Sequence, residues 1–433
     1  MTSPTPRPAP TGASGEAPAG KAPAGKAPAG ETEFRLRSIA LSAYGPTVVA
    51  AIGAGAMAPV VALAALDLGA SPSVAAFTAG LVLVAELFFA VPAGALVHRV
   101  GERRALLWAC AVDGLASFAA FVAPSLPVLM VAVFAMGFTG SMFLVARQAY
   151  LIEAVPFRMR ARAMSTLGGV HRIGLFVGPF IGAPLIHAWG PKAGFAVAGV
   201  AGVAAALLVW FAPDITAEHE AAERAARDGA AESGTPVARS TLGLIWAHRR
   251  TYLTLGLGVL VIGAARSARM VLVPLWAAHV GLSPSATAVI FGITGGVEML
   301  LFYPAGSVMD RFGRFWVAVP CVVLLGIGLL LLPLTTSAAT VLAASTLAAI
   351  GNGLGSGIVM TLGADNAPSI GRSQFLGGWR FVSVVGGSGA PLLISVVTAQ
   401  VSLAVACLTL CGLALLGTGW LGYWVPRFDP TRR

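Results

Sequence analysis

Twelve apolar segments, each about 20 residues long or longer, follow one another along this chain of 433 residues. An apolar segment of about 20 residues crosses the hydrocarbon core of a bilayer as a helix, because there is no water there to satisfy an open backbone. The order of the segments therefore predicts an all-α membrane protein with twelve transmembrane helices. We place them near residues 39–65, 72–96, 105–123, 127–150, 164–187, 194–212, 251–278, 283–308, 315–334, 338–362, 374–398 and 402–425.

The composition points to the same environment. Hydrophobic residues make up 57% of the chain and charged residues 11%, against about 25% charged residues in an average soluble domain. A soluble fold could not hide that much apolar surface, so membrane lipid is an expected partner. The four cysteines all lie in apolar segments without the spacing of metal ligands, and we expect no metal site.

The basic residues are distributed as in a membrane protein. The net charge is +10, but lysines and arginines stand in short clusters between apolar segments, a pattern that excludes nucleic acid as a partner. With both termini in the cytoplasm, Lys192 is the only basic residue of the outer loops. Basic loops stay on the cytoplasmic side, so we expect a multi-pass protein of the cell (cytoplasmic) membrane with both termini inside.

The segments fall into two groups of six, separated by a polar linker. The N-terminal stretch is rich in Pro, Ala and Gly, a composition that cannot bury a core and is typical of disorder. Within the linker, residues 217–232 have the mixed charge of a solvated helix. The predicted organisation is a cytoplasmic tail at 1–36, a six-helix bundle at 37–213, a cytoplasmic linker at 214–250, a second six-helix bundle at 251–425, and a short cytoplasmic tail at 426–433.

The two groups are internal repeats. Glu86 opens a pattern that returns at Glu298, 212 residues later. A second match, between residues 167–186 and 376–394, has an offset of 207 to 209, which a small deletion would explain. Two halves of the same orientation are parallel repeats, and these hold their site between the halves near the middle of the membrane.

A glycine- and arginine-rich loop follows the second and the eighth segments. The complete copy consists of Gly306, Asp310, Arg311, Gly313 and Arg314. The first copy keeps Gly94, Arg99 and Gly101, has His98 and Glu102 in place of the aspartate and the last arginine, and continues with Arg103. Glycine permits a tight turn, and an aspartate there can meet a helix N-terminus or a neighbouring arginine. We interpret both loops as gates.

The fifth segment carries a run of small residues, namely Gly174, Gly178, Pro179 and Gly182. Small residues four apart let two helices pack closely. Together with the gate loops and the six-plus-six layout, this pattern resembles the major facilitator superfamily over the chain that follows the N-terminal tail. The resemblance implies a two-bundle transporter that works by alternating access, and the fifth-segment motif implies an exporter of the antiporter type.

Several charges lie inside the apolar segments, where each costs at least about 2.5 kcal/mol. Arg266 and Arg269 share one helix face, and Glu298 lies at a comparable depth on the next helix, which makes it their natural partner. Two interpretations stay open: a proton or substrate pathway, or buried structural pairs. The candidate pathway residues are Glu86, Asp113, Glu298, Arg266, Arg269 and Arg147; Arg147, Arg172 and Arg380 have the alternative of reaching to the inner surface.

The predicted function is secondary active transport that exports small amphipathic or anionic molecules, with the proton as the candidate coupling ion. The chain has no Gly-x-x-x-x-Gly-Lys-(Ser/Thr) phosphate loop, so we expect neither ATP-driven pumping nor a cofactor. The alternatives are a proton-coupled importer of a small metabolite and, less favoured by the spread of the charges, a polytopic membrane enzyme. The expected partners are a small-molecule substrate, lipid and protons, and the expected state is a monomer.

Overall fold

The computed structural model describes residues 44–155, 160–212, 241–368 and 372–428. The predicted linker helix at 217–232 and both tails lie outside these residues. The first half contains α1 (Gly45–Met57), α2 (Val61–Asp67), α3 (Pro72–Val100), α4 (Glu102–Phe121), α5 (Leu126–Ala154), α6 (Arg160–Trp189) and α7 (Ala193–Phe211).

The second half begins with short helical turns and continues with long helices. It contains α9 (Thr241–Ala247), α10 (Arg249–Thr251), η4 (Tyr252–Gly256), α11 (Leu257–His279), α12 (Pro284–Phe312), α13 (Phe315–Leu331), η5 (Leu332–Leu334), α14 (Ala338–Leu354), η6 (Gly355–Gly357), α15 (Ile358–Asn366), α16 (Arg372–Gln400) and α17 (Leu403–Phe428). Within the described residues, 11 helices are long and apolar enough to cross a membrane, or 12 if α1 and α2 form one bent span. The predicted all-α fold with twelve spans is confirmed.

The first span is broken where its counterpart is continuous. The axes of α1 and α2 meet at 42°, and Pro59 lies in the turn between them. Proline has no backbone N–H and cannot continue the helical ladder. The equivalent helix α11 carries its own proline, Pro274, inside an uninterrupted helix.

The helix boundaries repeat at an offset of 212 through both halves. Helices α3 and α12 are related by this offset at both ends, and α5 is related in the same way to the stretch from α14 to α15. Equivalent serines, Ser71 and Ser283, cap α3 and α12 through side-chain hydrogen bonds to a backbone N–H. Equivalent glycines, Gly101 and Gly313, end them at φ 92° and 94°, a left-handed conformation that favours glycine.

The fifth span of each half follows the same offset, which corrects the sequence alignment. A Cβ atom at Gly174 would lie 2.6 Å from the carbonyl O of Val48, and one at Gly386 would overlap the carbonyl O of Leu260. Both residues of each pair are 212 apart, so no deletion separates α6 from α16. The alignment by letters was wrong by about one helical turn, a slip that keeps small residues on the same face.

Close helix packing is built from small residues. Gly178 of α6 lies so near α1 that a Cβ atom there would overlap the carbonyl O of Ile52 and lie 2.7 Å from the N of Ala56. Gly174 packs against Ala51 in the same groove. The predicted packing face of the fifth span is therefore present, and its partner is the first span.

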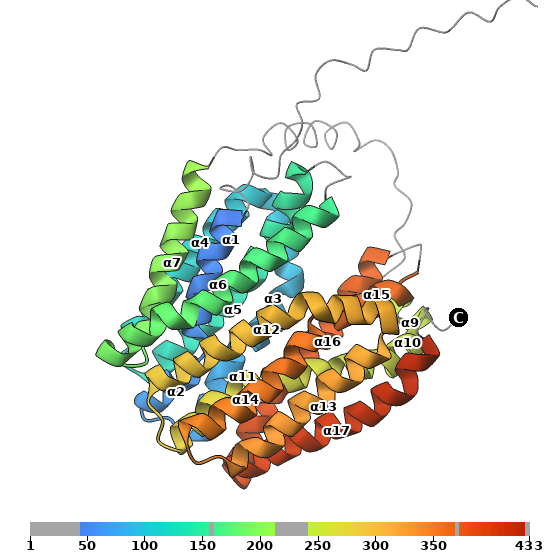
Figure 1. The fold of residues 1–433 in the computed structure, drawn as a ribbon. Helices are drawn as coiled ribbons and strands as arrows, with labels where there is room; N and C mark the ends of the chain where they lie inside the picture. The colour runs from blue at the N-terminus through green and yellow to red at the C-terminus, as the bar shows by residue number, and fades with distance from the viewer. Residues whose placement is uncertain (1–43, 156–159, 213–240, 369–371, 429–433) are drawn as a thin grey trace, which may run out of the picture. The chain divides into compact units, whose positions relative to one another are not determined.

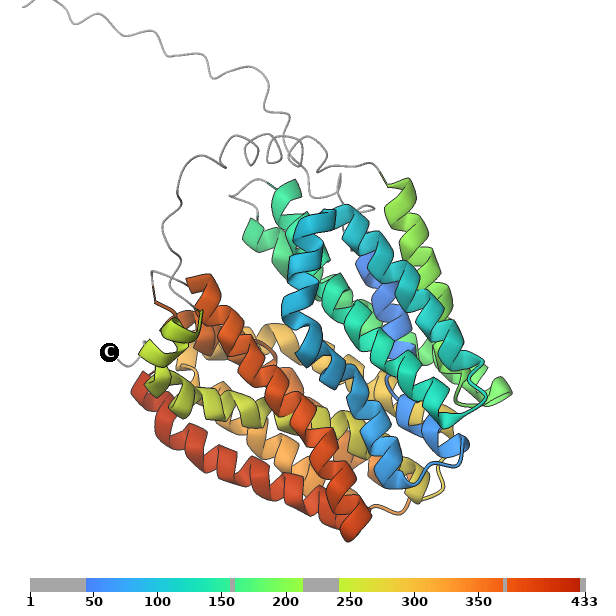
Figure 2. The same cartoon turned by 180° about the vertical axis from the view of Figure 1, so that it is seen from behind.

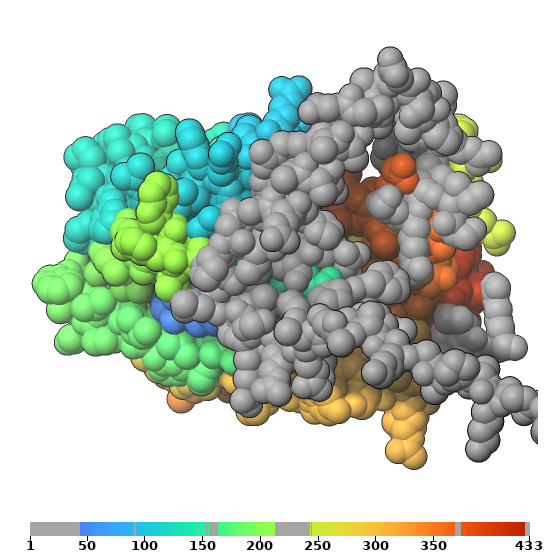
Figure 3. All heavy atoms as spheres, turned by 90° about the horizontal axis from the view of Figure 1, so that it is seen from above, coloured from blue at the N-terminus to red at the C-terminus, as the bar shows by residue number. Residues whose placement is uncertain are grey.

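The halves meet along two helix pairs, α3 with α16 and α6 with α12 (Figures 1 and 2). Ser388 Oγ donates a hydrogen bond to the carbonyl O of Leu83 at 2.9 Å, and the ring of Phe180 covers Gly292. These contacts lie on the parts of the helices distant from the gate loops. In the space-filling view, described atoms of the first half (blue to green) and of the second (yellow to red) lie on opposite sides (Figure 3).

Candidate functional site

A cavity of about 450 Å³ lies between the halves. Helices α1, α3 and α6 of the first half and α11, α12, α14 and α16 of the second contribute its walls. Four charged side chains face it, Arg172, Arg266, Arg269 and Glu298. We call it the central cavity. Its position between parallel repeats is the one expected from the sequence.

Glu298 is held by two donors from its own half. Arg269 Nη2 lies 2.5 Å from Glu298 Oε1, and Asn352 Nδ2 donates to Glu298 Oε2 at 2.6 Å. The Arg269 side chain is 7% exposed and that of Glu298 15%. The expected pairing of Glu298 with a seventh-span arginine is therefore present at Arg269, and each carboxylate oxygen has a partner.

The other two arginines of the central cavity have no carboxylate partner among the described residues. Arg266 Nη2 donates to the carbonyl O of Gly355, and the Arg172 guanidinium lies 4.3 Å from the centroid of the Phe302 ring. Arg172 and Arg266 are close enough to interact electrostatically, and they come from different halves. The idea that Arg172 reaches to the inner surface is wrong, because its guanidinium faces the central cavity.

A second cavity, of about 330 Å³, lies within the first half and contains the remaining candidate pathway residues. Asp113 accepts a hydrogen bond from Thr139 Oγ1 at 2.7 Å. Arg147 Nη1 lies 3.3 Å from His171 Nδ1. The structure thus places Asp113, Arg147 and Glu86 together, and separates them from Arg266, Arg269 and Glu298.

The repeated glutamates differ in their partners. Glu86 Oε1 lies 3.4 Å from Arg380 Nη2 of α16, an ion pair that joins the two halves. Glu298 pairs within its own half. Arg380 is therefore engaged by Glu86 and does not reach for the surface as one interpretation had it. Equivalent positions in the repeat serve a contact between halves in one copy and a contact within a half in the other.

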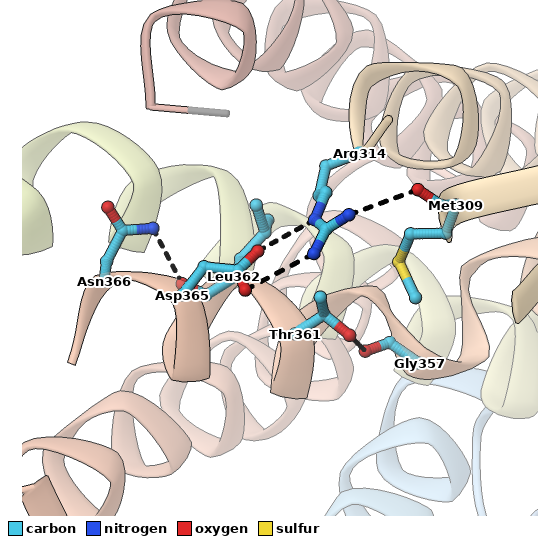
Figure 4. A network of polar contacts seen from close by, with 7 residues as sticks. All are labelled: Met309, Arg314, Gly357, Thr361, Leu362, Asp365 and Asn366. Atoms are coloured by element: carbon cyan, nitrogen blue, oxygen red, sulfur yellow. Dashed lines mark hydrogen bonds and ion pairs between the residues drawn. The ribbon is translucent and has the colours of Figure 1, made fainter. Parts of the chain in front are cut away.

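Each gate loop binds its own half in this conformation. Arg103 Nη2 donates to the carbonyl O atoms of Val209, Trp210 and Ala212 at 3.2, 3.1 and 2.6 Å and so caps the end of α7. Arg314 Nε donates to Asp365 Oδ2 at 2.8 Å, and its Nη1 to the carbonyl O of Met309 (Figure 4).

The expected role of Asp310 needs a correction for this conformation. Asp310 is exposed, and the arginine of its loop, Arg314, binds Asp365 instead. A Cβ atom at Gly94 or Gly306 would meet nothing within 4 Å, so neither helix is packed against a partner at the gate glycine. An Asp310 contact with the first half would require those surfaces to approach each other.

Replacing Asp365 by asparagine is expected to lower stability by about 1 kcal/mol or more, because Arg314 loses a charged acceptor in a largely buried position. Asp310→Asn is the matched control and should change stability by less than about 0.5 kcal/mol, since the side chain is exposed. The measurement is the thermal unfolding of the full chain purified in detergent. A larger loss for Asp310→Asn than for Asp365→Asn would contradict the assignment of the pair.

The sequence gave no signal for several of these partners. Asn352 and Thr139 are uncharged residues of apolar helices, and Asp365 is 51 residues from Arg314. Arg172 was noticed, but its depth alone did not decide where it points. A repeat alignment at the offset of 212 would have placed Asn352 opposite Gly140, beside the acidic cavity of the first half.

Two six-helix halves that enclose a charged cavity in the plane of a membrane define a membrane transporter rather than an enzyme. The chain belongs to the Major Facilitator Superfamily, whose sequence profile matches residues 47–391 and again residues 255–433. The second match covers the second half, as expected for a chain with two related halves.

Solved structures share the fold over nearly the whole chain. A D-xylose–proton symporter is similar with a TM-score of 0.69 and 14% identity, covering 91% of this chain and 99% of that one. A peptide transporter of the POT family, solved in complex with sulfate, has a TM-score of 0.72 and 13% identity, covering 90% and 95%. The inward-open xylose transporter XylE from E. coli has a TM-score of 0.67 and 14% identity, covering 90% and 96%. No curated protein sequence matches the chain.

Proposed function

We propose that the chain is a secondary active transporter of the cytoplasmic membrane that exports a small amphipathic or anionic molecule by alternating access. The observation that carries this proposal is the charged central cavity between the two halves. Pockets of about 300–1,000 Å³ hold small organic molecules, and the cavity falls in this range. Both termini are proposed to lie in the cytoplasm, from the charge of the loops.

Export is the proposed direction because the fifth span carries the small-residue motif of antiporter-type exporters. In the structure this motif packs α6 tightly against α1 through Gly174 and Gly178. Import by proton symport is the second candidate. The D-xylose–proton symporter shares the fold, but 14% identity carries no statement on direction. The two directions give opposite results in the experiment below.

Protons are proposed to act on the ion pair between Glu86 and Arg380. This pair ties α3 of the first half to α16 of the second. A proton on Glu86 removes the charge of the carboxylate and weakens the attraction to Arg380. Proton binding would then favour a conformation in which the halves separate along α3 and α16, because a ligand shifts an equilibrium by its differential affinity for the two states.

Proton coupling predicts that carboxylate variants lose the response to a pH gradient. Inverted membrane vesicles with and without the protein are loaded from outside with one fluorescent probe at a time: anilinonaphthalene sulfonate as the anion, ethidium as the cation, and Nile red as the neutral compound. We expect an inside-acidic gradient to drive uptake of at least one probe, and expect Glu86→Gln and Asp113→Asn to reduce gradient-driven uptake at least tenfold.

The controls separate transport from coupling. Vesicles without the protein measure passive entry, and a reversed gradient tests the direction of coupling. Uptake driven only by the reversed gradient would favour symport over antiport. Undiminished gradient-driven uptake in both variants would refute the proton assignment of Glu86 and Asp113, whereas protein-dependent uptake without any gradient response would refute proton coupling.

A further inference from the structure

The charges of the central cavity do not balance. Three arginines, Arg172, Arg266 and Arg269, face the cavity with a single carboxylate, Glu298. The Glu298 carboxylate is already paired with Arg269 and hydrogen-bonded by Asn352. Two positive charges therefore stand against the cavity with no carboxylate to neutralise them among the residues that the structure describes. A charge at this depth costs at least about 2.5 kcal/mol, which an anionic ligand would offset.

Hydrogen-bond donors also remain open at this wall. In the described part of the chain, Arg266 Nε, Arg269 Nε, Ser267 Oγ and Ser356 Oγ are buried without a hydrogen-bond partner. All four residues line the central cavity, and Ser267 and Arg269 are each 6% exposed. Buried donors of this kind nearly always have a partner in a folded protein. The four atoms thus indicate a ligand rich in acceptor atoms.

The remaining wall is apolar. Leu175, Met270, Phe291 and Val384 line the same cavity as the arginines. An apolar wall next to unpaired guanidinium groups suits a molecule with an apolar body and an acidic head. A metal cation or an organic amine would instead be repelled by the net positive charge of the wall.

We propose that the substrate is an organic anion whose acidic head lies between Arg172 of α6 and Arg266 of α11. This inference rests on the proposed transport function and names the substrate class of that site. The planar guanidinium binds carboxylate, phosphate and sulfonate oxygens with two parallel hydrogen bonds. Since Arg172 belongs to the first half and Arg266 to the second, one anionic head would bind both halves at once.

The arrangement gives the anion a second role beyond filling the cavity. In the empty cavity the two guanidinium groups repel each other across the boundary between the halves. A bound anion replaces this repulsion by attraction to both. The head group is therefore expected to favour conformations in which α6 and α11 stay close, and neutral analogues of the same shape cannot have this effect.

The test compares probes of one skeleton and different charge. The detergent-purified full chain is titrated with 3-phenylpropionate, 3-phenylpropanol and 3-phenylpropylamine, and binding is measured by isothermal calorimetry and by thermal stabilisation. Phenyl phosphate and benzenesulfonate test other acidic heads. We expect the anions to bind at least tenfold more tightly than the alcohol and the amine, with an affinity that falls as salt is added.

Variants place the head group. Arg172→Gln and Arg266→Gln are each expected to weaken binding of 3-phenylpropionate at least tenfold. The double variant should lose clearly less than the product of the two single losses, because residues that share a ligand group are coupled. Arg250→Gln is the matched control, since Arg250 is exposed at the start of the seventh span, and its affinity should equal that of the unchanged protein.

Three results would overturn the inference: no binding of any anion of the panel, binding of the alcohol or the amine as tight as that of the anions, or unchanged anion affinity in both arginine variants. These results leave the transport function standing if a cationic or neutral dye is carried in the vesicle experiment. Arginine-dependent anion binding without transport of any probe would count against the proposed function alone.

Discussion

Replacement of Glu298 by glutamine is expected to abolish transport and to lower the free energy of unfolding by about 3–5 kcal/mol. The carboxylate is 15% exposed and compensates Arg269, which is 7% exposed at a distance of 2.5 Å. Removing one member of a buried pair leaves the other charge without compensation, and this uncompensated charge is the large term. Glutamine keeps the shape and the acceptor for Asn352, so the loss isolates the charge.

Two further variants test that explanation. Arg269→Met combined with Glu298→Gln removes both charges and should recover most of the lost stability, because a neutral pair costs little in a buried site. Glu86→Gln is the matched control: its partner Arg380 is 48% exposed, and an exposed pair contributes less than about 1 kcal/mol. Thermal and chemical unfolding of the detergent-purified chain give the values. Equal losses for Glu298→Gln and Glu86→Gln would contradict the burial argument.

Enlarging Gly178 is expected to prevent the first span from docking. A Cβ atom there would overlap the carbonyl O of Ile52, and backbone atoms cannot move aside as a flexible side chain can. We expect Gly178→Leu to yield no folded protein and Gly178→Ala to lose at least about 1–3 kcal/mol. The readouts are the yield of monodisperse protein in detergent and the midpoint of thermal unfolding.

The same helix supplies the control. A Cβ atom at Gly168 would meet nothing within 4 Å, so Gly168→Ala should gain up to about 1 kcal/mol from helix propensity alone. Gly386→Ala, at the equivalent position of the second half, should be as harmful as Gly178→Ala, since its Cβ would overlap the carbonyl O of Leu260. A Gly178→Ala protein as stable as the unchanged chain would show that α1 and α6 can move apart without cost.

The features that depend on one helix at a time were predictable from the sequence. The spans follow from apolar length, and the two halves follow from a pattern that returns after 212 residues. The pairing of Glu298 with the seventh span was also predictable, because depth along two consecutive helices places it beside Arg269. Each of these predictions uses only distance along the chain and the thickness of a bilayer.

The contacts between distant helices could not be read in this way. Glu86 and Arg380 are 294 residues apart, and nothing in either segment says that α3 lies beside α16. Arg314 had a nearby carboxylate in its own motif, Asp310, yet it binds Asp365 of α15. The position of α16 was misaligned by about one turn, because a helix rich in glycine presents small residues on the same face after each turn.

The unequal number of positive and negative groups in the central cavity also ties the protein to the electrical potential of its membrane. When access to the cavity changes sides, the two uncompensated charges pass from one side of the voltage drop to the other without moving far themselves. A full elementary charge gains or loses about 2.3 kcal/mol per 100 mV. The empty carrier would be drawn toward the negative side of the membrane, and a bound anion would cancel that pull. Voltage would then act on the return of the empty protein more than on the loaded step.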